Sequence, residues 1–190
     1  MNEQIFFTLH GLAHQSCPTD KIIIFLADYL PYILIVLTIV YAFRADFGRF
    51  SLKNPFGIFK KRMGFLLDTL GLATISWLVT DILKGIINYP RPFIVFKETI
   101  TPLFTHGGMD SFPSGHAAFF SALALSFFIA DRRLGYIATA CALLIGVTRV
   151  ISGIHFPIDI LFGYLIGLLV VMLYHLITDI KKRSLKETIE

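Results

Sequence analysis

Long apolar stretches separated by short polar connections dominate the pattern of this chain. A helix that crosses the hydrocarbon core of a bilayer needs about 20 largely apolar residues, and five stretches meet this requirement. They predict an all-α, polytopic membrane helix bundle with five transmembrane helices. The stretches are 22–43, 63–87, 112–130, 134–154 and 156–177.

Two shorter segments flank these stretches. Apolar residues recur at helical spacing within 2–15, a segment that is too short to cross a bilayer. We therefore expect an N-terminal interfacial helix within 1–20 and a basic cytoplasmic tail at 178–190, so that 1–190 forms a single membrane-embedded domain. The apolar residues of the first segment are Ile5, Phe6, Leu9 and Leu12.

Composition supports the assignment to a membrane. Hydrophobic residues make up 55% and charged residues 16% of the 190 residues, and the mean hydropathy is +0.72. A soluble domain has about 45 to 50% apolar and about 25% charged residues, so the soluble classes are excluded. The net charge of +4 could suggest a nucleic-acid partner, but the positions of the charges indicate membrane topology instead.

The seventeen Lys and Arg residues divide unequally between the two sides that five alternating spans define. Twelve fall on one side and five on the other. Because cytoplasmic loops collect positive charge and anionic lipid of the inner leaflet attracts it, we expect the side with twelve to face the cytoplasm. No nucleic-acid partner is expected. The five outer residues are Lys21, Lys84, Arg91, Lys97 and Arg149.

The first polar group on the outer side runs from Lys84 to Pro92. Pro90 and Pro92 end a helix and favour extended backbone, so we expect Arg91 on a stiff, non-helical segment. Lys84 lies near the same membrane depth, where leaving two cations unpaired is costly. The pair is either part of an anion site or a pair of snorkelling anchors at the end of a span.

The second group is Ser111-Phe112-Pro113-Ser114-Gly115-His116, at the start of a stretch without charged residues. Ser114 is suited to cap a helix, and the free amide hydrogens of a helix N-terminus attract phosphate. Gly115 has no side chain to obstruct an anion, and His116 can donate or accept a proton. The alternative is an ordinary helix start.

The third group runs from Arg149 to Asp159. Gly153 permits a turn between two spans, and Pro157 suits the first position of the last helix. Asp159 then falls in the first turn, from which its carboxylate can reach back to His155. A carboxylate that accepts from one imidazole nitrogen fixes the tautomer and leaves the other nitrogen free.

These groups converge on the outer ends of consecutive spans, where three cations, two histidines and a helix N-terminus suit phosphoryl transfer. Three positive side chains can stabilise the phosphoryl oxygens without a metal ion. We expect no metal or other cofactor, because the outer side lacks a cluster of the carboxylates that magnesium prefers. His106, Asp110 and His116 are the alternative metal-ligand set.

The three groups resemble the signature of the type-2 phosphatidic acid phosphatase superfamily, integral-membrane lipid phosphatases that share a core with vanadium haloperoxidases. The family pattern is Lys-x6-Arg-Pro, then Pro-Ser-Gly-His, then Ser-Arg-x5-His-x3-Asp. Only Thr148 departs from it, a hydroxyl residue where the family usually has Ser. The matching positions are Lys84, Arg91, Pro92, 113–116, Arg149, His155 and Asp159.

The resemblance implies a role for each of these residues. His155 is similar to the nucleophile that forms a phosphohistidine, with Asp159 orienting it, and His116 is similar to the acid that protonates the leaving oxygen. His116 would then act as the base when water releases phosphate. The residues that the resemblance assigns to phosphate binding are Lys84, Arg91, Ser114, Gly115 and Arg149.

The resemblance also bears on the substrate. The five-span plan, the opening segment and the loop 106–114 are similar to bacterial undecaprenyl-diphosphatases of the bacitracin-resistance type. This similarity implies hydrolysis of a lipid diphosphate on the extracytoplasmic face of the bacterial inner membrane. His106 and Asp110 are candidate substrate-loop residues. Many members of that group carry Asp at the position of Gly115, so phosphatidylglycerophosphate, phosphatidate and lipid A remain alternative substrates. A transporter or receptor would need the cations but not His155 with Asp159.

Overall fold

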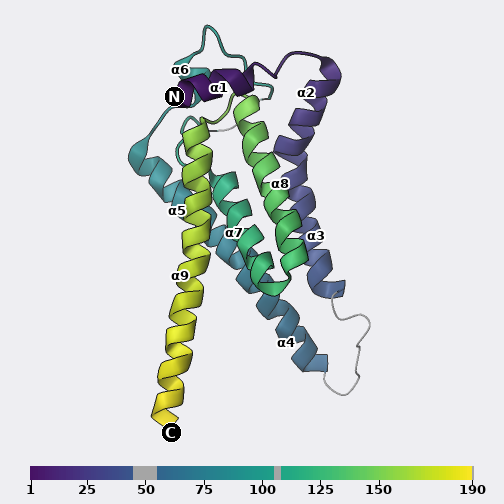
Figure 1. The fold of residues 1–190 in the computed structure, drawn as a ribbon, viewed down its shortest axis with the longest axis vertical. Helices are drawn as coiled ribbons and strands as arrows, with labels where there is room; N and C mark the ends of the chain where they lie inside the picture. The colour runs from purple at the N-terminus through teal and green to yellow at the C-terminus, as the bar shows by residue number, and fades with distance from the viewer. Residues whose placement is uncertain (45–54, 105–107, 190) are drawn as a thin grey trace.

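The computed structural model describes residues 1–44, 55–104 and 108–189, with side chains left out at 44–58 and 187–189. Helices make up most of this part of the chain (Figure 1). They are α1 (Asn2–His10), α2 (Cys17–Ile24), η1 (Phe25–Tyr29), α3 (Leu30–Arg44), α4 (Pro55–Leu66), η3 (Leu67–Gly71), α5 (Leu72–Ile87), α6 (Pro92–Val95), α7 (Gly115–Ala130), α8 (Arg132–Ile151) and α9 (Pro157–Ile189).

Long helices run alternately up and down in Figure 1, so the prediction of a helical membrane bundle is confirmed. Within the described ranges, four helical segments are long and apolar enough to span a bilayer. The apolar helix α7 has 16 residues, which corresponds to about 24 Å and is shorter than a bilayer core of about 30 Å. The four long segments are Cys17–Phe43, Phe59–Ile87, Arg132–Ile151 and Pro157–Lys186.

The short helix α7 occupies the centre of the bundle. Ten of its residues are buried, and it packs most extensively against α8 and α9, then α5. Gly163 and Gly167 permit the close approach of α9, because a side-chain carbon at either position would collide with the backbone of α7. Small residues four apart are a common way to bring membrane helices together. This contact places the start of α9 beside the start of α7.

Two long helical segments continue without a break. Asp28 and Pro31 lie in one continuous helical segment, which accommodates them through the π-helical turn η1 rather than a break. At the other end of the chain, the expected tail at 178–190 continues α9 as a helix as far as Ile189.

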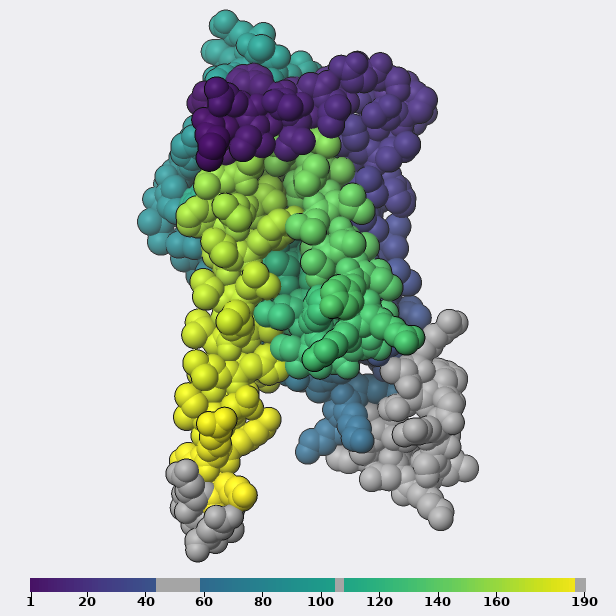
Figure 2. Space-filling view, viewed as in Figure 1, coloured from purple at the N-terminus to yellow at the C-terminus, as the bar shows by residue number. Residues whose placement is uncertain are grey.

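The two ends of the bundle differ in charge. The basic segments at the start of α8 and in the last turns of α9 lie at the lower end in Figure 1. The upper end holds α1, α6 and the connections between α5 and α7 and between α8 and α9. All three polar groups singled out in the sequence belong to this upper end. The segment for which we expect an interfacial helix forms α1, which lies across this end of the bundle in Figure 2.

Candidate active site

A polar cavity of about 490 Å³ lies at the upper end of the bundle. It combines residues of α5, the connection to α7, the first turn of α7 and the loop before α9. Residues from all three predicted groups therefore reach one cavity. The lining residues are Trp77, Asp81, Lys84, Gly85, Arg91, Gly108, Asp110, Gly115, His116 and His155.

Arg91 is held by backbone contacts that join the first group to the second. Its backbone N–H donates to the carbonyl of Met109 at 3.2 Å, and Ser111 N–H donates to the carbonyl of Tyr89 at 2.7 Å. The Arg91 side chain is 1% exposed, and its Nε donates to the carbonyl of Gly108 at 3.0 Å. Two strand-like segments thus hold the guanidinium in place, in agreement with the stiff backbone that Pro90 and Pro92 predict.

The imidazole of His155 is fixed on both sides. Its Nδ1 donates to Asp159 Oδ2 at 3.3 Å, and its Nε2 lies 3.4 Å from Nη1 of Arg91. Asp159 Oδ2 also accepts from the backbone N–H of Phe156 at 2.7 Å and from the hydroxyl of Ser111. These contacts give the tautomer in which Nδ1 carries the proton and Nε2 accepts from Nη1 of Arg91, and both residues line the polar cavity.

Burial and charge keep this imidazole neutral. His155 is 1% exposed, and burial lowers its pKa well below the ordinary value, with further lowering by the positive charges of Arg149, Arg91 and Lys84. Burial also lowers the pKa of Arg91 to about 10, while the carboxylates of Asp159 and Asp110 act in the opposite direction. Arg91 therefore stays positively charged at neutral pH, and His155 stays a neutral base.

Arg149 reaches the site from the last turn of α8 and is fully buried. Its Nη1 donates to the carbonyl of Ala27 at 3.2 Å. Ala27 lies within η1, where the wider π-helical turn alters the usual backbone pairing. A backbone carbonyl of the first span therefore holds the guanidinium of Arg149. The sequence had placed this residue in the third group and gave no sign of the contact.

Ser114 is the N-cap of α7, and its hydroxyl accepts from the N–H of Ala117 at 3.5 Å. Its own N–H donates to the carbonyl of Asp159 at 3.0 Å, so the second and third groups are joined through the backbone. Packing also favours glycine at position 115, in addition to the room for an anion that the sequence suggested. A side-chain carbon there would lie 2.7 Å from the Trp77 ring.

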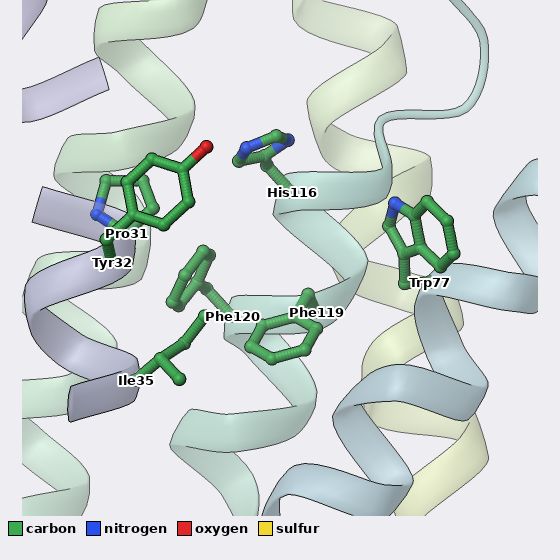
Figure 3. A pocket seen from close by; sticks show the side chains of 7 residues that line it. All are labelled: Pro31, Tyr32, Ile35, Trp77, His116, Phe119 and Phe120. Carbon is green, nitrogen blue, oxygen red and sulfur yellow. The ribbon is translucent and has the colours of Figure 1, made fainter. Parts of the chain in front are cut away.

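His116 lies where the polar cavity meets an apolar one. The second cavity, of about 210 Å³, is lined by side chains of α3, α5 and α7. Figure 3 shows His116 at one end of it, between Tyr32 and Trp77, with Phe119 and Phe120 further along α7. Trp77 and His116 line both cavities. The site thus has a charged compartment and an apolar one on either side of the same imidazole.

The structure can be compared with the predicted site residue by residue. Lys84, Arg91, Gly115, His116, His155 and Asp110 line the polar cavity. Ser114, Arg149 and Asp159 are buried next to lining residues, whereas His106 lies outside the described residues. Sequence reasoning gave no role to Ser111, Ala27 or Trp77, which carry no charge and stand out only once their contacts are known.

The alternative interpretation of His106, Asp110 and His116 was a set of metal ligands. Within the described ranges, no group of three or more His, Cys, Asp or Glu side chains could hold a metal ion. His106 of the alternative ligand set lies outside those ranges. The positive charges that face the cavity come from Lys84 and Arg91, with Arg149 buried nearby.

Known proteins resemble the chain in sequence and in structure. It is 28% identical to the undecaprenyl-diphosphatase BcrC of Bacillus subtilis, over 95% of this chain and 86% of that protein. It is 39% identical to a lipid A 1-phosphatase of Rhizobium etli, over 48% of this chain and 41% of that protein. The crystal structure of LpxE from Aquifex aeolicus superposes with a TM-score of 0.68 at 27% identity, covering 90% of this chain and 93% of that one.

The family model that matches describes the PAP2 superfamily, and the match covers residues 65–183. This region includes α5 and the helices α6 to α8, together with most of α9. It therefore contains all three groups of polar residues that line or support the cavity. The resemblance drawn from the sequence is confirmed: this chain belongs to the PAP2 superfamily.

Proposed function

We propose that this protein hydrolyses a lipid phosphate or diphosphate at the outer face of the membrane, without a metal ion and through a phosphohistidine. The observation that carries the proposal is the geometry of His155, which lines the cationic cavity and whose Nδ1 contacts Asp159 while its Nε2 lies 3.4 Å from Nη1 of Arg91. A neutral imidazole held in this tautomer is a ready nucleophile. Lys84, Arg91 and Arg149 would balance the charge of the phosphoryl oxygens.

The reaction has two steps in which His116 exchanges its role. In the first, Nε2 of His155 bonds to phosphorus, the bond from phosphorus to the leaving oxygen breaks, and His116 gives that oxygen a proton. In the second, His116 takes a proton from water, whose oxygen bonds to phosphorus as the bond to Nε2 breaks. Inorganic phosphate leaves and both histidines return to their starting states. Ser114 and the Gly115 amide would hold a phosphoryl oxygen at the N-terminus of α7.

The apolar cavity beside His116 favours a lipid substrate. A phosphate held near His155 and Arg91 would leave its ester chain on the side of His116, where Tyr32, Phe119 and Trp77 line the apolar space. A hydrocarbon chain gains about 25 cal/mol for each Å² that it removes from water. The charged group and the chain would thus occupy the two compartments on either side of His116.

Undecaprenyl diphosphate is the substrate that we favour, with undecaprenyl phosphate and inorganic phosphate as products. The similarity to BcrC extends over 95% of this chain, whereas the similarity to the lipid A 1-phosphatase covers 48% of it. Phosphatidylglycerophosphate, phosphatidate and lipid A are the alternative substrates. They share the phosphate chemistry and differ in the leaving group and in the chain.

Phosphate release by the purified protein in detergent tests the proposal. We expect release from a long-chain prenyl diphosphate to exceed that from phosphatidate, phosphatidylglycerophosphate and lipid A, and to persist in excess EDTA. Labelled substrate should leave an acid-labile, base-stable phosphate on the wild type and none on His155→Ala. Turnover by His155→Ala near the wild-type rate would exclude the phosphohistidine. Activity that EDTA removes and a divalent ion restores would exclude the metal-free mechanism.

A labelling experiment tests the side of the membrane. Lys97 lies in the connection between α6 and α7 at the upper end of the bundle, and Arg133 lies at the start of α8 at the lower end. Both native cysteines are replaced first, since Cys17 is exposed. A membrane-impermeant thiol reagent should then label Lys97→Cys in intact cells and leave Arg133→Cys unlabelled. The opposite pattern would place the site in the cytoplasm.

A further inference from the structure

Helix α1 lies outside the residues that the PAP2 model matches. It nevertheless contacts the chain just before and just after His155. The matched region is 65–183, and α1 spans Asn2–His10. In Figure 2 it covers the upper ends of α8 and α9, between which this loop runs. We propose that α1 is a positioning element that fixes the nucleophile loop, with His10 and Asn2 as positioning residues.

His10 contacts the loop before the nucleophile. Its Nδ1 lies 2.8 Å from the carbonyl oxygen of Ile151, and because a carbonyl can only accept, the ring must donate. Ile151 is the last residue of α8, so this bond satisfies a carbonyl near a helix end. The ring also lies against Gly153, where a side-chain carbon would be 3.1 Å from Cε1 of His10. Gly153 has a φ of 79°, so it serves both the turn and this contact.

Asn2 and Phe6 contact the loop after the nucleophile. Oδ1 of Asn2 accepts from the N–H of Ile158 at 3.1 Å, which is one of the free amides in the first turn of α9. Phe6 is fully buried, and its ring centroid lies 5.3 Å from that of Phe156, the residue next to His155. Helix α1 therefore contacts the chain before His155 through His10 and after it through Asn2 and Phe6.

This arrangement predicts an effect on the chemical step rather than on binding. Neither His10 nor Asn2 lines the polar cavity, so neither is placed to contact the phosphate. A displacement of about 1 Å in a reacting group can cost about 100-fold in rate. Loosening the loop should therefore lower kcat and leave KM nearly unchanged. The inference rests on the proposed role of His155.

The test compares His10→Leu, which removes the donor, with His10→Asn, whose amide nitrogen takes about the place of the ring Nδ1. His14→Asn is the matched control. It removes a similar contact, from Nε2 to the carbonyl of Thr101 at 2.9 Å, and Asn tolerates the positive φ of 60° at this position. Each full-length variant is assayed in detergent with a long-chain prenyl diphosphate and with a five-carbon isoprenyl diphosphate.

We expect His10→Leu to lower kcat about tenfold or more on both substrates, with KM within about twofold and slower formation of the phosphoenzyme in a single turnover. His10→Asn should recover most of the rate, and His14→Asn should behave as the wild type. If His10→Leu does not fold, Asn2→Ala and Asn2→Asp form the second pair, because Asp retains the acceptor for the Ile158 N–H.

Three results would overturn the inference: a wild-type kcat in the variants that lose a contact, a loss confined to the long-chain substrate, or a loss that the conservative variants do not restore. The second result would indicate that α1 only anchors the protein at the membrane. His155→Ala separates this inference from the proposed function. If that variant is inactive while His10→Leu is unimpaired, the inference about α1 alone fails.

Discussion

The two histidines of the site sit in very different surroundings. His155 is 1% exposed, and both ring nitrogens have partners within 3.5 Å in the described structure. His116 is half-buried and lies where the polar cavity meets the apolar one. A nucleophile benefits from a fixed position and a fixed tautomer. A group that serves as acid and then as base needs access to the leaving oxygen and then to water. The difference in burial fits the two proposed roles, and the following experiments test it.

The largest effect is expected from loosening the fixed histidine. Asp159→Asn keeps an oxygen that can accept from the N–H of Phe156, but it no longer favours the proton on Nδ1 of His155. Activity should fall about 10³-fold or more, because the imidazole can then turn or adopt the other tautomer. Ser111→Ala, which removes one supporting contact to the same carboxylate, should cost much less. The measurement is the steady-state rate of both variants, with circular dichroism as a folding control. Equal small losses would contradict the orienting role of Asp159.

His116→Ala should give the next largest effect, and one that depends on the substrate. The acid should contribute about 10²- to 10⁴-fold when the leaving group is an alkoxide, as from phosphatidate. A prenyl diphosphate releases a phosphate ester, a weaker base that needs less protonation, so its loss should be smaller. We would compare kcat/KM for both substrates in the wild type and the variant. Equal losses would remove the acid role from His116.

The pH dependence should separate the two histidines further. His155 attacks as the neutral base, so activity is lost as the pH falls through its pKa. Burial and three positive side chains lower this pKa. The loss of activity at low pH that His155 controls, the acid limb of the profile, should therefore lie below the ordinary histidine pKa of about 6.5. Lys84→Gln removes one of these charges, which raises the pKa of His155 and moves the limb to higher pH. Lys97→Gln, an exposed site, is the control, and an unmoved limb in Lys84→Gln would contradict the electrostatic account.

The smallest effect is expected at the apolar side of His116. Tyr32→Ala removes a ring from the apolar cavity and should raise KM for a long-chain prenyl diphosphate by about threefold, since part of the contact with the chain is lost. Tyr29→Ala is the matched control, because Tyr29 is similarly exposed but lies outside the cavity lining. The five-carbon diphosphate should show no change with either variant. A similar rise in KM for both substrates would place the long chain elsewhere.

The sequence predicted those features that depend on local patterns. Apolar runs predicted the membrane helices, and Ser114 was recognised as an N-cap that the structure contains. The spacing of Pro157, Asp159 and His155 predicted a carboxylate that reaches back across the first turn of α9, and the 3.3 Å contact agrees with this. These are short-range relations, which the geometry of a helix determines without knowledge of the rest of the fold.

Other features could not be read from the sequence because they depend on residues far apart in the chain. Ser111 is an ordinary polar residue until Asp159, 48 positions away, lies beside it. Ala27 has no functional group in its side chain, and only the turn of η1 directs its carbonyl toward Arg149. Likewise, the apolar spacing of α1 predicted an interfacial helix but gave no sign that Phe6 packs against Phe156.

The convergence of Lys84, Arg91 and Arg149 on one site has a consequence for the thermodynamics of the protein as a whole. Their mutual repulsion opposes folding when the site holds no anion, and a bound phosphate would relieve it. Any ligand that binds only the folded state raises its stability, by about 2.7 kcal/mol at 100 times Kd. Inorganic phosphate should therefore raise the thermal unfolding temperature in detergent, and Arg149→Gln should weaken the increase. The product that the proposed reaction releases would then also be a competitive inhibitor and a stabilising additive for purification.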